Sequence, residues 1–285
     1  MEVKKKILVL GSSGLLGSYL LKKLSKKHNL FSSSRNTNKD FIFNLPTFES
    51  DLSTFINLNS IDYVINTVGC TDVDLCEENP QLAYELNSKL PGLVHNSIKN
   101  SSKECKQIYI STDSFYSFGN STELDVIPEN IYSLTKLHGE KFANSQSAII
   151  LRTNFFGKSV SKNKKSFSDW ILESLKKGEK INGFEDVIFS PISLDRLCYC
   201  ISLILDNPIP GVFNVGALDS ISKYEFCLRV AEKYKFSPKN IKPVKASSME
   251  LAAKRSNNMS MNSEKFFFDY SIKNKYIGDD LENLA

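Results

Sequence analysis

The sequence predicts an α/β fold built on a doubly wound, mostly parallel sheet. Three observations lead to this: an apolar run of strand length at 7–10, a glycine-rich turn directly after it, and a one-sided helix pattern after the turn. The alternation of strand and helix patterns then continues, which is typical of a parallel sheet with helices on both faces. Further strands are expected around 30–31, 41–43, 63–65, 108–110 and 148–151, and the main helices at 80–99 and 131–146.

The turn reads Gly11-x-x-Gly14-x-x-Gly17. Glycine permits a positive φ and lets the backbone approach a pyrophosphate closely, while the helix N-terminus offers N–H groups and partial positive charge. Between a strand and a helix, this pattern predicts a Rossmann-type dinucleotide site. The residues expected at the cofactor are Gly11, Ser13, Gly14, Leu15, Leu16 and Gly17 in the turn, and Thr67, Val68 and Gly69 after the strand at 63–65.

Arg35 indicates which dinucleotide is bound. An NAD enzyme commonly carries a carboxylate about 20 residues after the glycine turn, where it binds the ribose 2′-hydroxyl, whereas NADP needs positive charge near its 2′-phosphate. No carboxylate lies between His28 and Lys39, and Arg35 follows the expected second strand. The sequence therefore favours NADPH over NADH as the cofactor.

Composition excludes several classes of partner. Lys plus Arg number 36 against 32 for Asp plus Glu, and the net charge of +4 is spread along the chain, so nucleic acid is not expected as a partner. No run approaches the roughly 20 apolar residues of a membrane span, and the first residues contain no apolar signal region, so we expect a cytoplasmic protein without a membrane partner. The six cysteines form no Cys-x-x-Cys pair and the three histidines are far apart, which predicts buried thiols and no metal site.

A second, smaller domain is expected where the pattern loosens after Arg152. A polar segment at 158–166 precedes a helix pattern at 167–177, and the rest of the chain is rich in Lys, Ser and Asn. Two apolar stretches, 187–189 and 194–205, are expected to return to the sheet, so that the domains interleave. The predicted division is an NADP-binding domain at 1–155, extended by 187–206, and a substrate-binding domain formed by 156–186 and 207–285.

Tyr132 and Lys136 are a candidate catalytic pair. Their spacing places a phenol and an ammonium on one face of a helix, where the cation is expected to lower the tyrosine pKa and allow proton exchange with a carbonyl or alcohol oxygen. Tyr19 and Lys23 have the same spacing, so the pattern alone is not specific. What distinguishes Tyr132 is the Ser-Thr-Asp sequence at 111–113, which ends a strand at the carboxyl edge of the sheet, where ligands of such folds bind.

The order of glycine turn, strand-end Ser-Thr-Asp and Tyr-x-x-x-Lys resembles the short-chain dehydrogenase/reductases. Three longer stretches resemble one family within this superfamily: Thr-Asp-Val-Asp-Leu-Cys-Glu-Glu-Asn-Pro at 71–80, Tyr-Ser-Leu-Thr-Lys-Leu-His-Gly-Glu at 132–140 and Leu-Arg-Thr at 151–153. With these, nearly the whole chain resembles the dTDP-4-dehydrorhamnose reductase family, an extended branch of that superfamily. The resemblance implies an oxidoreductase that uses NADPH to reduce a 4-keto sugar attached to a nucleotide diphosphate, in sugar-nucleotide and cell-surface polysaccharide biosynthesis.

The resemblance also implies roles for single residues. Tyr132 would donate the proton, and Lys136 would activate this tyrosine and bind the cofactor ribose. Thr112 would polarise the carbonyl, while the smaller domain would hold the nucleotide sugar. The chain departs from the family pattern at 114–119, Ser-Phe-Tyr-Ser-Phe-Gly, a stretch expected to border the substrate. The expected substrate-binding residues are Thr112, Asp113, Ser114, Asn154 and Arg255.

Other functions stay open at this point. A sugar-nucleotide dehydratase is disfavoured because Ser114 stands where such enzymes carry a Glu for elimination. An epimerase would use the same fold with tightly held NAD. A non-catalytic NADP-binding subunit, resembling the regulatory beta subunit of methionine adenosyltransferase, is the alternative outside enzymes. The sequence does not determine the sugar, the nucleotide base, the stereochemistry of reduction or whether the protein is a homodimer.

Overall fold

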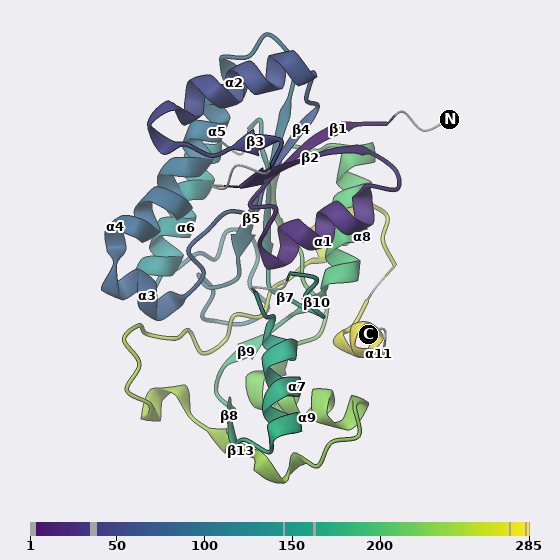
Figure 1. The fold of residues 1–285 in the computed structure, drawn as a ribbon. Coiled ribbons are helices and arrows are strands. Elements are labelled where there is room, and N and C mark those ends of the chain that lie inside the picture. Colours follow the sequence, from purple (N-terminus) through teal and green to yellow (C-terminus); the bar gives the residue numbers. More distant parts are fainter. Residues whose placement is uncertain are drawn as a thin grey trace.

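The computed structural model describes residues 4–34, 39–144, 146–161, 164–273, 275–282 and 284. In Figure 1 a larger lobe, with a sheet between two groups of helices, stands above a smaller lobe that contains α7 (Phe167–Lys177) and α9 (Lys223–Lys233). The chain passes between the lobes more than once, because α8 (Leu194–Asp206) belongs to the larger lobe although it lies between α7 and α9 in sequence.

The central sheet has seven parallel strands in the order β11-β6-β5-β4-β1-β2-β3. The chain runs outward from the centre in both directions, so the strand order reverses between β1 and β4, which is where doubly wound sheets bind ligands. The predicted fold class is confirmed. The strands are β1 (Lys6–Leu10), β2 (Asn29–Ser34), β3 (Phe41–Ile42), β4 (Tyr63–Asn66), β5 (Lys106–Thr112), β6 (Ile149–Thr153) and β11 (Gly211–Asn214).

Alternate residues of β1 face opposite layers of helices. Ile7 and Val9 pack in the core with residues of α1 (Leu15–Leu24) and α8. Leu8 and Leu10 pack with residues of α2 (Phe48–Asn59) and α5 (Leu90–Lys99). A strand covered on both faces is apolar at every position, which explains why the run at 7–10 is continuous rather than alternating.

Helix α6 (Ile131–Ala143) packs against α5 and against a π-helical turn, η2 (Tyr84–Lys89). This turn follows α3 (Val73–Glu78) and α4 (Pro80–Ala83) and divides the single helix predicted at 80–99. Gly139 permits the close approach: a Cβ at this position would lie 1.9 Å from the Asn87 carbonyl oxygen and 2.8 Å from the Tyr109 hydroxyl. The absence of a side chain therefore brings α6 into contact with this layer.

Aromatic packing holds the smaller lobe together. Phe226 of α9 is fully buried and contacts the rings of Phe156, Phe167 and Phe189. The helix predicted at 167–177 is confirmed as α7. The remaining elements of the described chain are β7 (Phe155–Phe156), β8 (Ile181–Phe184), β9 (Ile188–Phe189), β10 (Ile192–Ser193), β12 (Ile221–Ser222), β13 (Ile241–Val244), α10 (Glu264–Asp269), α11 (Ile277–Glu282), η1 (Leu45–Thr47), η3 (Pro238–Asn240) and η4 (Ala246–Ser248).

The structure corrects part of the predicted domain division. The sequence places all of 207–285 in the smaller domain, but β11 pairs with β6 and completes the large sheet, with Gly211 opposite Ile149. Of the two stretches expected to return, α8 packs on α1, whereas β9 pairs with β12 outside the large sheet. A short apolar run predicts a strand but not the strand with which it pairs, because that pairing is a contact between distant parts of the chain.

The polar segment before α10, which includes Ala253 and Ser260, also returns to the larger lobe. The Asn120 amide donates to Ser260 Oγ at 2.8 Å, and the Ala253 amide donates to Asp74 Oδ1 at 2.9 Å. This segment therefore lies over the loop between β5 and α6 and over α3.

All six cysteines are buried and unpaired, as predicted for buried thiols. Burial raises the pKa of the Cys105, Cys198 and Cys227 thiols to about 12, which keeps them protonated at neutral pH. Of the helices in the described ranges, none combines the length and the apolar character needed to cross a membrane.

Gly139→Ala is expected to lower the free energy of unfolding by ~1–3 kcal/mol, because the new methyl group would overlap the Asn87 carbonyl oxygen. Urea unfolding monitored by circular dichroism measures the change. Gly278→Ala is the control, since a Cβ at Gly278 meets no atom within 4 Å. Equal stability of the Gly139→Ala and wild-type proteins would contradict the close contact between α6 and η2.

Candidate active site

The glycine turn has the geometry that a dinucleotide site requires. Gly11 has a φ of +78°, and a Cβ there would lie 2.8 Å from Thr67 Oγ1. A Cβ at Gly17 would lie 2.3 Å from the Gly11 carbonyl oxygen. Gly14 caps α1 without a side-chain hydrogen bond, and the first turn of the helix carries no acidic residue. The N–H groups at this helix end therefore suit an anion such as a pyrophosphate.

Thr67, Val68 and Gly69 follow β4 beside this turn. Thr67 Oγ1 donates to the Leu10 carbonyl at 2.7 Å, which ties the segment to the end of β1. A Cβ at Gly69 would lie 4.0 Å from Lys136 Nζ. The segment predicted to contact the cofactor therefore extends from the glycine turn to the predicted catalytic lysine.

The other predicted cofactor residues have different surroundings. Ser13 is exposed, and its carbonyl accepts a hydrogen bond from Ser161 Oγ at 3.0 Å. Leu15 is half-buried, and the Leu16 side chain packs in the core, so the predicted contact of Leu16 with the cofactor depends on its backbone N–H in the first turn of α1. Arg35 lies outside the described residues.

Tyr132 and Thr112 meet at the carboxyl end of β5. The start of α6 is set by a capping box, in which the Ser133 amide donates to Asn130 Oδ1 at 2.8 Å. Tyr132 follows in the first helical turn, where it is buried and its hydroxyl hydrogen-bonds with the Thr112 side chain. Thr112 Oγ1 also accepts from the Ser114 amide at 3.2 Å. The structure thus brings together the two hydroxyl groups predicted to act on the carbonyl.

Lys136 lies one turn further along α6 and is buried. Its ammonium donates to the Ile110 carbonyl at 2.7 Å and lies 4.2 Å from the centre of the Tyr109 ring. Burial lowers the pKa of Lys136 from 10.5 to about 7, while the negative charge of Glu140 raises it. This lysine is therefore near its protonation midpoint at neutral pH.

The predicted lowering of the Tyr132 pKa is wrong. Burial raises the pKa of this phenol above its ordinary value, and the hydrogen bond with Thr112 opposes the rise only in part. The Lys136 ammonium is directed to the Ile110 carbonyl, and the low pKa of Lys136 leaves this side chain only partly charged at neutral pH, so the cation does not offset the effect of burial on the phenol. Tyr132 is therefore protonated at neutral pH, the state that a proton donor needs.

Asp113 lies between the catalytic residues and the smaller lobe. Asn154 Nδ2 donates to Asp113 Oδ2 at 2.9 Å. Lys223, the first residue of α9, lies with its ammonium 3.4 Å from the centre of the Phe189 ring. Burial raises the pKa of the Asp113 carboxyl, while the positive charge of Lys223 and the Asn154 amide lower it. Asp113 and Asn154, two of the predicted substrate residues, therefore lie near the positive charge of Lys223 from the smaller lobe.

The first three residues of the stretch at 114–119 differ in their relation to the site. The Ser114 hydroxyl accepts a hydrogen bond from Thr112 at 3.2 Å. Phe115 and Tyr116 are fully buried and pack with Met261, so these two do not line a substrate site as expected. Large aromatic side chains gain most from burial, and the returning C-terminal segment supplies the cover.

Arg255, the predicted substrate residue of the smaller domain, is paired with a carboxylate. Its Nη2 lies 2.7 Å from Asp74 Oδ2, and its Nη1 donates to the Ala253 carbonyl at 2.9 Å. Asp74 belongs to α3, so this pair links the C-terminal segment to the larger lobe. Arg255 therefore pairs with Asp74, a partner far away in sequence, and its role toward a nucleotide diphosphate stays a prediction.

The second Tyr-x-x-x-Lys match belongs to a helix contact. Lys23 pairs with Asp195 of α8 at 2.5 Å, and its ammonium lies 5.4 Å from the centre of the Tyr19 ring. This pair joins α1 to α8 on a face of the sheet. The carboxyl edge beside Thr112 therefore distinguishes Tyr132 from Tyr19.

Sequence reasoning missed three charged residues near the site: Lys223, Glu140 and Arg152. Ser222 and Glu225 form a capping box, a sequence signal that indicates where α9 begins. No local signal shows that this helix begins opposite Asp113. Glu140 and Arg152 stand within the stretches that resemble the family, but their mutual contact joins a helix to a strand and has no local signature.

The low pKa of Lys136 predicts how stability depends on pH. The folded protein releases this proton near pH 7 and the unfolded chain near 10.5, so between these values the unfolded state binds more protons. The free energy of unfolding of the wild type is therefore expected to rise with pH relative to Lys136→Met, by up to ~1.4 kcal/mol per pH unit. Urea unfolding from pH 6 upward measures the two curves, and parallel curves would contradict the shift.

Comparisons with known proteins place the chain in a family. The RmlD substrate binding domain model matches residues 5–284. A probable low-salt glycan biosynthesis reductase, Agl14 of Haloferax volcanii, is 25% identical over 240 residues, which cover 79% of this chain and 78% of that protein. A crystal structure described as a hypothetical dTDP-4-dehydrorhamnose reductase from Sulfolobus tokodaii has a TM-score of 0.80 and 30% identity, covering 92% of this chain and 93% of the other.

A second solved structure contains the predicted cofactor. The dTDP-4-dehydrorhamnose reductase of Bacillus anthracis in complex with NADP has a TM-score of 0.85 and 22% identity, covering 99% of each chain. At this identity the likeness shows the fold. Together with the match over almost the whole chain, these findings confirm the family expected from the motifs: the protein belongs to the RmlD substrate binding domain family.

Proposed function

We propose that this protein is an NADPH-dependent oxidoreductase that reduces the 4-keto group of a sugar linked to a nucleotide diphosphate. One observation carries the proposal: Thr112, Tyr132 and Lys136 lie together at the carboxyl edge of the sheet, on the side that the glycine turn borders. Its relatives named as reductases support the same reaction class. The predicted place in sugar-nucleotide and polysaccharide biosynthesis follows from this proposal.

Each side chain of the site has a separate role in the reduction. Bound NADPH would supply the hydride. Tyr132 donates its phenolic proton to the oxygen of the substrate carbonyl, and the Thr112 hydroxyl donates a hydrogen bond to the same oxygen. The raised pKa of Tyr132 keeps that proton in place until the oxygen becomes basic. Lys136 binds the cofactor ribose and stabilises the phenolate left by the transfer.

The nucleotide sugar is proposed to bind between Asp113 and the start of α9. Asp113, Ser114 and Asn154 offer hydrogen-bonding groups on the larger lobe, and Lys223 offers a positive charge from the smaller one. Arg255, which pairs with Asp74 at 2.7 Å, stays a predicted ligand of the nucleotide diphosphate. A homodimer and a cytoplasmic location stay predictions.

Tyr132→Phe is expected to lower kcat for NADPH oxidation in the presence of a dTDP-linked 4-keto sugar by about 100-fold or more, because phenylalanine has no proton to donate. The KM for NADPH is expected to change little. The loss of NADPH absorbance measures both constants. Tyr19→Phe serves as the matched control, since it removes the hydroxyl of the other Tyr-x-x-x-Lys match and should leave kcat unchanged.

Three measurements separate the reductase from its alternatives. Consumption of NADPH across a panel of nucleotide 4-keto sugars supports the reductase. Tightly bound NAD in the purified protein, with no net consumption, would indicate an epimerase. A cellular phenotype that survives Tyr132→Phe but depends on a partner enzyme would indicate a regulatory subunit.

Arg35→Asp is expected to raise the KM for NADPH by about 10-fold, equivalent to ~1.4 kcal/mol, and to lower the KM for NADH. The new carboxylate would repel the 2′-phosphate of NADPH and accept a hydrogen bond from the ribose hydroxyl of NADH. Steady-state kinetics with both cofactors measure the ratio. An unchanged ratio would show that Arg35 does not distinguish them.

A further inference from the structure

A buried ion pair lies next to Lys136, outside the predicted catalytic set. Glu140 follows Lys136 by one turn of α6, and its side chain is 5% exposed. Arg152 of β6, 4% exposed, binds this carboxylate with two nitrogens: Nη2 lies 2.6 Å from Oε2, and Nε donates to Oε1 at 3.0 Å. Charges this far from water need such a bidentate partner.

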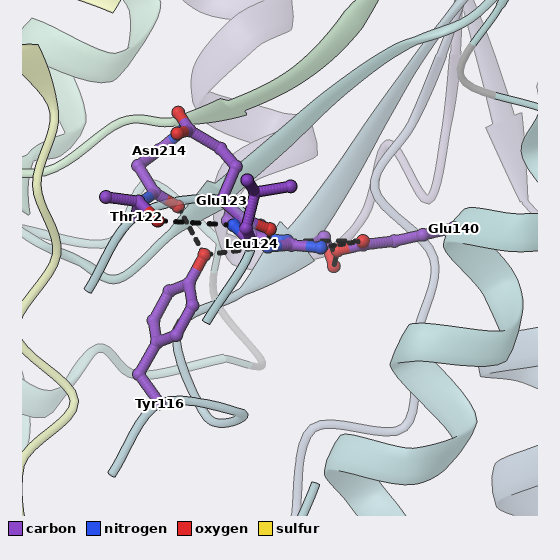
Figure 2. A network of polar contacts seen from close by, with 8 residues as sticks. Tyr116, Thr122, Glu123, Leu124, Glu140 and Asn214 are labelled. Atoms are coloured by element: carbon purple, nitrogen blue, oxygen red, sulfur yellow. Dashed lines mark hydrogen bonds and ion pairs between the residues drawn. The ribbon is translucent and has the colours of Figure 1, made fainter. Parts of the chain in front are cut away.

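Hydrogen bonds extend the pair on both sides. Ser111 Oγ donates to Glu140 Oε1 at 2.5 Å. On the other side, Arg152 Nη1 donates to the Tyr116 hydroxyl at 2.8 Å, and this hydroxyl donates to Asn214 Oδ1 at 2.6 Å. Figure 2 shows Glu140 reaching in from the helix, with Tyr116 and Asn214 meeting on the opposite side. The network therefore joins α6 to β5, β6 and β11.

The network reaches the catalytic edge at consecutive residues of β5. Ile110 accepts the hydrogen bond of Lys136 at 2.7 Å. The next residue, Ser111, donates to Glu140 and is paired with Arg152 in the sheet register. Thr112 comes directly after it. Helix α6 is thus attached to β5 at two successive positions immediately before the threonine that meets Tyr132.

We propose that Glu140 is a positioning residue for the reduction: held by Arg152, it keeps the Lys136 ammonium charged and fixes it at the end of β5 beside Thr112. This inference rests on the proposed function, in which Lys136 acts on the cofactor and on Tyr132. Glu140 would contact neither substrate nor cofactor and would act only through the lysine.

Lys136 has titratable neighbours on two elements: Tyr132 and Glu140 lie on its own helix, and Tyr109 lies on β5. The Arg152 guanidinium on β6 binds the Glu140 carboxylate and so weakens, without removing, its effect on Lys136. Burial raises the pKa of both tyrosines above the ordinary value, so they are neutral near pH 7. Glu140 therefore supplies the negative charge that favours the ammonium form of Lys136.

The test is a titration of Lys136 that needs no substrate. Full-length protein carrying lysine labelled with ¹³C at Cε is titrated by NMR, and the Lys136 resonance is assigned by its loss in Lys136→Arg. In Glu140→Gln, which keeps the shape of the side chain and removes the charge, the midpoint of Lys136 is expected to fall by at least about half a pH unit. Because no turnover is involved, this result is independent of the identity of the substrate.

Asp280→Asn is the matched control for losing a buried carboxylate. Asp280 pairs with Arg196 at 2.7 Å, and the two side chains are 6% and 9% exposed, at the contact of α11 with α8. This variant is expected to lose stability but to leave the Lys136 midpoint unchanged. If Glu140→Gln does not fold, the double variant Glu140→Gln/Arg152→Gln removes both charges and leaves neither unpaired. A smaller fall is then expected, because the positive charge of Arg152, which disfavours the ammonium form of Lys136, is lost as well.

Kinetics supply the second readout. Glu140→Gln is expected to lower kcat for NADPH oxidation about 3-fold or more at pH 8 and less at pH 6, because a midpoint lowered by half a pH unit leaves about one third as much charged Lys136 at the higher pH. Asp280→Asn should change kcat less than 2-fold at both values. An unchanged Lys136 midpoint in the variant that folds, or an equal shift in Asp280→Asn, would overturn the proposal. A shifted midpoint in a protein that reduces no 4-keto sugar would instead reject only the proposed function.

Discussion

The contact between helix α6 and the carboxyl half of β5 is the constraint on which the candidate site depends. Gly139 admits the Tyr109 side chain of β5 beside the Asn87 carbonyl of η2, and Lys136 donates to the carbonyl of Ile110. These contacts lie within little more than one turn of the helix. Tyr132 belongs to the helix, whereas Thr112 belongs to the strand, so any outward movement of α6 would separate the two hydroxyl groups that are proposed to act on one oxygen.

Burial sets the protonation states at this edge of the sheet. The same exclusion of water raises the pKa values of Tyr132 and Asp113 and lowers that of Lys136. Tyr132 therefore keeps its proton at neutral pH, and Lys136 loses its own at a lower pH than a lysine in water. A protonated phenol beside a hydroxyl suits delivery of a proton to a carbonyl oxygen, which agrees with a reductase.

The buried and the exposed ion pairs differ in how much they contribute to stability. Removing one partner of a buried pair such as Arg152 and Glu140 costs about 3–5 kcal/mol, because the other charge is left unpaired in the core. Arg255 and Asp74 are partly exposed, and a pair of that kind contributes about 0–1 kcal/mol. The buried pair therefore holds the elements of the site, while the exposed pair adds a weaker link between the C-terminal segment and α3.

The sequence by itself determined the α/β class, the strands before β7, the glycine turn and the pairing of Tyr132 with Lys136 on one helix. These features depend on local periodicity, on the conformational freedom of glycine and on fixed helical spacing. Only the tertiary structure decided that β11 completes the sheet, that Arg255 binds Asp74 and that burial raises the Tyr132 pKa. The physical reason is that strand partners, ion pairs and desolvation depend on residues far apart in the chain, whereas a local pattern records only neighbours.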